Sequence, residues 1–131
     1  MARIERFEDI ESWKKGRALT REIYRITSTG RLAQDFCLRD QMRRACISIV
    51  SNIAEGFERS GDREFVNFLA IAKGSCGELR SQLYLVRDLE YISVEQFESL
   101  TEAARDVGRL LSALMAYLDK STFRGNRFRY R

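Results

Sequence analysis

Residues 63–91 read REFVNFLAIAKGSCGELRSQLYLVRDLEY and carry apolar side chains at steps of three and four. This spacing is that of one face of an α-helix. The apolar positions are Phe65, Leu69, Ala72, Cys76, Leu79, Leu83, Val86 and Leu89. The chain contains no proline, so nothing interrupts the backbone hydrogen bonds of a long helix here. We therefore expect one long amphipathic helix over these residues.

Three further amphipathic segments flank it, at about residues 9–29, 35–57 and 93–118. Their apolar side chains recur at helical spacing, and strand-like alternation is absent from the sequence. Because the connections are short, neighbouring helices must run antiparallel. The sequence therefore predicts an all-α fold, an antiparallel up-down-up-down four-helix bundle at residues 1–118. Residues 119–131 are expected to form a separate basic and aromatic tail.

Two connections carry signals for the start of a helix. Ser93 and Gln96 have the spacing of a capping box, in which each side chain binds the backbone N–H of the other residue. Ser60 or Asp62 is expected to cap the helix over residues 63–91.

The composition restricts the chemistry that this chain can perform. Its 131 residues are 44% hydrophobic and 32% charged, which suits one globular domain with its own core. The absence of histidine removes Ser-His and Cys-His nucleophile pairs and histidine metal ligands. Cys37, Cys46 and Cys76 show no CxxC spacing and are expected to be buried or half-buried thiols in a reducing compartment. We expect no cofactor, no metal and no enzymatic activity.

No segment is long and apolar enough to span a membrane, and the first seven residues lack the apolar region of a signal peptide. We therefore expect a cytoplasmic protein.

The net charge of +4 is concentrated in residues 119–131, which hold five basic side chains and one acidic one. Arginine neutralises phosphate and aromatic rings stack on unpaired bases, so this tail suits single-stranded RNA or DNA. The candidate nucleic-acid-binding residues are Arg124, Arg127, Phe128, Arg129, Tyr130 and Arg131. The alternative is a disordered, solvated tail, or one folded onto residues 53–98, whose net charge is −4.

A polar stripe runs beside the apolar face of residues 35–57. If this segment and residues 63–91 form a hairpin, Arg43 or Arg44 comes within reach of Glu78 and can form a charge-assisted pair with it. The candidate network residues are Arg43, Arg44, Ser48, Asn52, Glu55 and Glu78. The stripe is expected to be an interhelix or intersubunit network that fixes register. The alternatives are a ligand site, or acid and base roles for Glu55 and Glu78.

Small residues and surplus apolar residues both point to close contacts. Gly74, Ser75 and Gly77 allow a neighbouring backbone to approach, either from another subunit or within one bundle. Apolar residues outside the main stripes exceed the needs of one core, and they are Phe57, Phe68, Ile71, Tyr84 and Leu85. Such residues often form interfaces, so we expect a homo-oligomer.

Several motifs also resemble those of a known bacterial family. They are Phe7-Glu-Asp-Ile-Glu-Ser-Trp13, Gln41-Met-Arg-Arg-Ala45, Ser48-Ile-Val-Ser-Asn-Ile-Ala-Glu-Gly56, Arg63-Glu-Phe65, Phe68-Leu-Ala-Ile-Ala-Lys-Gly-Ser75 and Glu78-Leu-Arg-Ser-Gln-Leu83. Through them the chain resembles the 23S rRNA intervening-sequence proteins over about residues 7–118. It departs from the family at Val50, where proline is usual, and at Gly61, where a capping serine is common.

The resemblance implies a homopentamer of four-helix bundles with no established catalytic activity. The accessory protein of diversity-generating retroelements is similar in fold and ring assembly, and it binds nucleic acid. We therefore expect a non-catalytic, ring-forming protein that binds RNA or single-stranded DNA through basic surfaces and its C-terminal tail. The alternative is a protein-protein interaction scaffold that does not bind nucleic acid.

Overall fold

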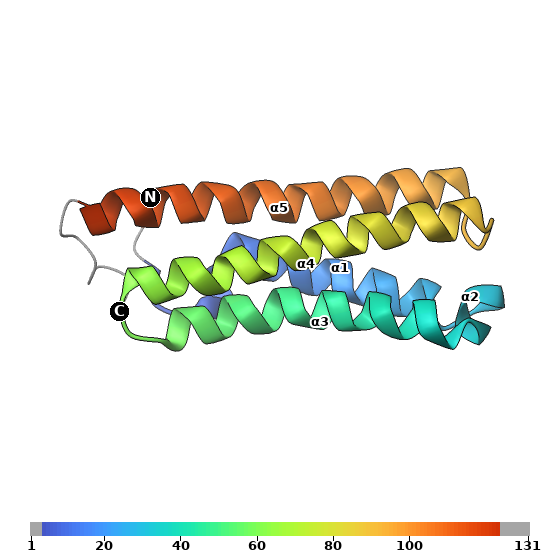
Figure 1. Cartoon of the computed structure of the whole chain (residues 1–131), viewed down its shortest axis with the longest axis horizontal. Helices are drawn as coiled ribbons and strands as arrows, with labels where there is room; N and C mark the ends of the chain where they lie inside the picture. The colour runs from blue at the N-terminus through green and yellow to red at the C-terminus, as the bar shows by residue number, and fades with distance from the viewer. Residues whose placement is uncertain (1–3, 124–131) are drawn as a thin grey trace.

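The computed structural model of the chain describes the backbone of residues 4–123 and the side chains of residues 4–120. Its elements are η1 (Phe7–Asp9), α1 (Glu11–Ile26), α2 (Gly30–Gln34), α3 (Phe36–Glu58), α4 (Asp62–Asp88) and α5 (Val94–Phe123). Within these residues there is no β-strand. Figure 1 shows α1, α3, α4 and α5 lying lengthwise beside one another, each running opposite to the next. The predicted all-α bundle is confirmed.

The core lies between the four long helices, and the short α2 covers one end of it. Helix α4 packs between α3 and α5, and α1 completes the bundle by packing against α3 and α5. The largest fully buried side chains are Ile23, Leu32, Met42, Ile49, Ile53, Phe65, Leu69, Leu79, Leu83, Leu111 and Leu118. Phe57 was expected outside the main stripes, and this is wrong. It is only 7% exposed, and its ring contacts that of Phe65 edge-on at 5.9 Å.

The two predicted helix starts have different outcomes. The capping box is confirmed, because the Gln96 N–H donates to Ser93 Oγ at 3.0 Å and the Ser93 N–H donates to Gln96 Oε1 at 2.9 Å. The expected cap of α4 is wrong, since the N-cap is Gly61 and neither Ser60 nor Asp62. Gly61 has φ of 87°, in the left-handed region that favours glycine, and this geometry turns the chain directly into α4.

The structure contains two short helices that the sequence analysis did not predict, and its last helix is longer than predicted. Helices η1 and α2 occupy stretches expected to be connections. Helix α5 continues through Phe123 and thereby includes the first five residues of the expected tail. The candidate nucleic-acid-binding residues of that tail (Arg124, Arg127, Phe128, Arg129, Tyr130 and Arg131) lie outside the described residues. Over residues 4–123, no helix has the length and apolar character needed to cross a membrane.

Candidate functional site

The predicted polar stripe of α3 forms a small hydrogen-bonded cluster with α4. Ser48 Oγ and Ser75 Oγ lie 2.8 Å apart across the two helices. Asn52 Nδ2 donates to Ser48 Oγ at 3.0 Å and to the Ser48 carbonyl at 2.8 Å. Glu55 instead pairs with Arg59 on the surface at 2.8 Å. The cluster therefore links α3 to α4 through hydroxyl and amide groups, without a buried charge.

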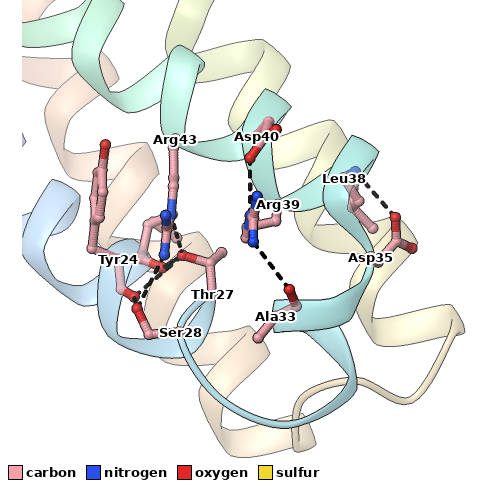
Figure 2. A network of polar contacts seen from close by, with 10 residues as sticks. Tyr24, Thr27, Ser28, Ala33, Asp35, Leu38, Arg39, Asp40 and Arg43 are labelled. Atoms are coloured by element: carbon pink, nitrogen blue, oxygen red, sulfur yellow. Dashed lines mark hydrogen bonds and ion pairs between the residues drawn. The ribbon is translucent and has the colours of Figure 1, made fainter.

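Arg43 binds α1 and not α4 (Figure 2). Its Nε donates to Thr27 Oγ1 at 2.8 Å and its Nη2 donates to Ser28 Oγ at 3.0 Å. Its guanidinium carbon lies 4.4 Å from the centre of the Tyr24 ring, which is a cation–π distance. Among the described residues, no ion pair joins Arg43 or Arg44 to Glu78, so the expected pair is wrong. Arg44 and Glu78 are both exposed to solvent.

The same end of the bundle is held together by further polar contacts (Figure 2). Asp35 caps α3, accepting from the Leu38 N–H at 3.2 Å. The Tyr91 hydroxyl, after the end of α4, donates to the other Asp35 oxygen at 3.0 Å. This hydrogen bond is the main cause that raises the pKa of Tyr91. Arg39 donates to the Ala33 carbonyl at 3.2 Å and so ties α2 to α3. These contacts position connections, and Asp35 and Leu38 also contribute to the lining of an apolar groove between α3 and α4.

A groove with basic walls lies between α4 and α5, which run side by side (Figure 1). It encloses about 540 Å³. Lys73 and Arg80 contribute from α4, and Arg105 and Arg109 contribute from α5. Cys76, Gly77, Ala104, Gly108 and Ser112 complete its lining. All four charged side chains that line this groove are basic.

The cations of the two walls differ in their partners. On α5, Arg109 pairs with Glu102 at 2.7 Å and with Asp106, and Arg105 lies 3.8 Å from Glu102. The hydrogen bonds to Glu102 and Asp106 raise the pKa of Arg109 above its ordinary value. On α4, Lys73 and Arg80 make no ion pair with any described residue. The positive charges of Lys73 and Arg80 on the α4 wall are therefore not neutralised by an acidic neighbour among the described residues.

The glycines of α4 are not explained by packing inside the bundle. A Cβ added at Gly74, Gly77 or Gly108 would meet no atom within 4 Å. Of the two alternatives for Gly74 and Gly77, tight packing inside one bundle is therefore excluded, and a contact with another subunit stays a prediction. Gly56 in α3 shows what such packing looks like, since an added Cβ would lie 2.6 Å from the Phe68 Cβ.

An apolar surface occupies another part of α4. Ile71, Leu85 and Leu89 are 52%, 51% and 48% exposed. Leu85 and Leu89 line a second, apolar groove of about 520 Å³ together with Cys37 and Leu38 of α3. We call Ile71 and Leu85 of α4, together with its C-cap residue Leu89, the aliphatic row of α4.

The thiols and carboxylates do not form a reactive or metal-binding centre in the described part of the chain. Burial raises the pKa of Cys46 to about 12 and that of Cys76 to about 11, so both stay protonated at neutral pH. Cys37 is exposed, against the expectation that all three thiols are buried or half-buried. Within residues 4–123, no group of three or more cysteine, aspartate or glutamate side chains could hold a metal ion.

Comparison with known proteins assigns the chain to a family. The family model described as 23S rRNA-intervening sequence protein matches residues 8–113. The chain belongs to this family. The matched residues include nearly all of the four long helices and both walls of the basic groove.

This family member also resembles a solved structure. The crystal structure of a protein of unknown function from the S23 ribosomal protein family of Bacteroides thetaiotaomicron is similar, with a TM-score of 0.73 and 26% sequence identity. The similarity covers 79% of this chain and 97% of the other. No curated protein matches the chain.

The basic groove of this family member was missed from sequence because residues 53–98 are acidic in sum. A usable signal exists in the spacing of the basic residues. Lys73, Arg80 and Arg87 recur every seven residues, which places them on one face of a helix. The exposed acidic residues of α4, Glu64, Glu78 and Asp88, lie at other positions around the helix, so the total charge of the segment hides a basic face.

Proposed function

We propose that this protein is non-catalytic and assembles with copies of itself into a ring. The observation that carries the proposal is the aliphatic row of α4, whose three large side chains are about half exposed. The resemblance to the intervening-sequence proteins supports five copies. The absence of histidine supports the non-catalytic part, because the common nucleophile pairs and general bases need that residue.

The aliphatic row has the geometry of a contact surface. Ile71 and Leu85 are separated by 14 residues, close to a whole number of helical turns, so they lie on the same face of α4. Leu85 and Leu89 continue into the apolar groove beside α3. The apolar surface is continuous at Leu85 and Leu89, and exposed apolar patches of this kind are typical of interfaces. If one subunit uses a different surface to receive the row of the next, the contacts repeat head to tail and can close into a ring.

Light scattering of the purified protein tests the assembly. We expect the wild-type chain to give five times its mass of 15.3 kDa. The double variant Ile71→Glu/Leu85→Glu would place two carboxylates in the contact, where burying their charges is unfavourable. It is therefore expected to give the single-chain mass. Val94→Glu is the control for a carboxylate added at an exposed apolar position outside the row, because Val94 is 59% exposed and lies in the first turn of α5. A wild-type mass of 15.3 kDa would contradict the proposal.

A second candidate function is binding of single-stranded RNA or DNA through the tail at residues 119–131. The observation that favours it is the sequence of this segment, with five basic side chains against one acidic one and three aromatic residues among them. In a ring the tails of all copies act together, so weak contacts add through avidity. Assembly and nucleic-acid binding then belong to one activity.

The tail is tested with a chain that ends at Phe123 and so keeps the whole of α5. We expect this chain to bind labelled single-stranded RNA more weakly than the full-length chain at low salt, and the difference to shrink as salt rises. Equal affinities would show that the tail does not bind RNA. If neither chain binds at low salt, the protein acts as an interaction scaffold without nucleic acid.

A further inference from the structure

We propose that the basic groove between α4 and α5 binds the sugar-phosphate backbone of single-stranded nucleic acid. This inference deepens the second candidate function and rests on it for the class of ligand. It assigns binding to a surface of the bundle itself, which the tail does not form.

The first step is the charge of the α4 wall. Lys73 and Arg80 carry positive charges with no acidic partner among the described residues, while Glu102 and Asp106 already occupy the arginines opposite. The Arg80 Nε is buried and makes no hydrogen bond within residues 4–123. A buried donor without an acceptor is unfavourable, and a phosphate oxygen entering the groove would accept from it.

The second step is the shape of the groove. Gly77 of α4 and Gly108 of α5 both line it, and a side chain at either position would meet open space. Glycine within a helix costs about 1 kcal/mol relative to alanine, and no packing inside this bundle requires it here. Glycine does permit a ligand to approach the helix backbone closely. The two glycines therefore keep open the floor between the two rows of cations.

The third step is the length of the basic row. Lys73, Arg80 and Arg87 repeat every seven residues along α4, and at 1.5 Å per residue the row is about 21 Å long. At the stacked spacing of 3.4 Å this corresponds to about six nucleotides. Lys73 and Arg80 line the groove, and Arg87 extends the row beyond it, beside Asp88 at 3.4 Å. A single phosphate ligand needs only one such position. The row therefore favours a polymer with repeating phosphates.

The fourth step is the aromatic pair at the Arg87 end of the row. Tyr84 of α4 and Phe97 of α5 meet edge-on at 5.1 Å, and the Arg87 guanidinium lies 5.0 Å and 4.7 Å from their ring centres. Tyr84 is 41% exposed, so its ring is accessible to an unpaired base. Cations followed by an exposed aromatic ring are typical of surfaces that bind single strands, and an acidic protein segment would not use the ring in this way.

Fluorescence anisotropy with a labelled 20-nucleotide single-stranded RNA tests the groove on the full-length protein. Lys73→Gln/Arg80→Gln is expected to weaken binding at low salt by about tenfold or more. It should also reduce the slope of log affinity against log salt by about 1.4, because two phosphate contacts are lost. The matched control is Lys14→Gln/Arg25→Gln on α1, diagonal to α4, where two exposed cations are removed. The control should bind as the wild type does.

The charge-retaining variant Lys73→Arg/Arg80→Lys should keep most of the affinity, which separates lost charge from disturbed folding. Three results would overturn the inference: wild-type protein that does not bind the RNA, a groove variant that binds like the control, or polyglutamate that competes as well as unlabelled RNA at equal charge. If truncation at Phe123 removes binding and the groove variant does not, the tail is the binding element and the groove is not.

Discussion

At the scale of single residues, Arg43 shows how one guanidinium can join two helices at three points. Its two nitrogen donors bind Thr27 and Ser28 at the end of α1, and its flat face lies against Tyr24. Thr27 and Ser28 also donate to carbonyls of the last turn of α1. Because each hydroxyl donates its hydrogen to a carbonyl of α1, its oxygen is oriented to accept from Arg43. The three contacts of Arg43 together fix the position of α1 along α3.

The three thiols are expected to differ sharply in reactivity. Burial raises the pKa of Cys76 to about 11 from 9.0, which lowers its thiolate fraction at pH 8 by about a hundredfold, and Cys46 is shifted further in the same direction. Cys37 is exposed and free. With a chromogenic disulfide reagent at pH 8, no more than one thiol per folded chain should react, and all three should react in guanidinium.

Rapid modification of a second thiol in the folded chain would contradict this assignment. Because Cys37 lines the apolar groove with Leu85 and Leu89, its rate also reports on the proposed assembly. We expect Cys37 to react faster in the Ile71→Glu/Leu85→Glu variant than in the wild-type chain.

Neighbouring residues of a helix point in different directions, and this limits what the sequence predicted for single side chains. Arg43 and Arg44 are adjacent in the chain, yet Arg43 contacts α1 while Arg44 is exposed. The stripe that contains Ser48 and Asn52 was identified from helical spacing, and its contact with α4 follows from the hairpin. The partner of Arg43 depended on where α1 ends, which the apolar pattern defines only to within a few residues.

At the scale of helices, two glycines within helices have opposite roles. Gly56 in α3 is buried against Phe65 and Phe68, and it allows α3 and α4 to approach. Gly77 in α4 is exposed and touches no neighbouring side chain. One glycine stabilises the hairpin by its small size, and the other weakens its helix.

Alanine substitution separates these roles. Gly77→Ala should stabilise the protein by about 0.5–1 kcal/mol, because alanine loses less backbone entropy and meets no obstacle. Gly56→Ala should destabilise it by roughly 1–3 kcal/mol, because the new methyl group would overlap Phe68. Urea denaturation followed by circular dichroism measures both changes. Shifts of the same sign would show that the packing around Gly56 is looser than the structure has it.

The ends of the helices show which local signals are sufficient. Ser93 and Gln96 form the predicted capping box, because both partners lie within one turn and need no distant contact. The start of α4 was assigned to the polar residues Ser60 and Asp62, whereas the chain uses the positive φ of Gly61. Helix α2 was missed because five residues are too few to establish a period. Backbone conformation and short helices thus depend on packing that the pattern does not contain.

At the scale of the whole molecule, the four long helices follow from apolar spacing, and their order follows from short connections. The charge of the surfaces does not follow from the charge of segments. Residues 53–98 sum to −4, and yet α4 contributes Lys73 and Arg80 to the basic groove. A helix divides its charges among its faces, so only the packed bundle shows which charges share a surface. The groove could not be predicted from either segment alone, because it forms where α5 lies beside α4 and its basic side chains come from both helices.

The arrangement of the helices also gives the molecule a direction. The start of α1 and the end of α5 lie at the same end of the bundle, and α2 and the connection between α4 and α5 lie at the other (Figure 1). In a ring with cyclic symmetry every copy points the same way, so every α5 would end on one side of the ring. Such a ring has two unlike sides. A partner recruited by the C-terminal segments meets the ring from one side only, and the opposite side stays free for a different molecule.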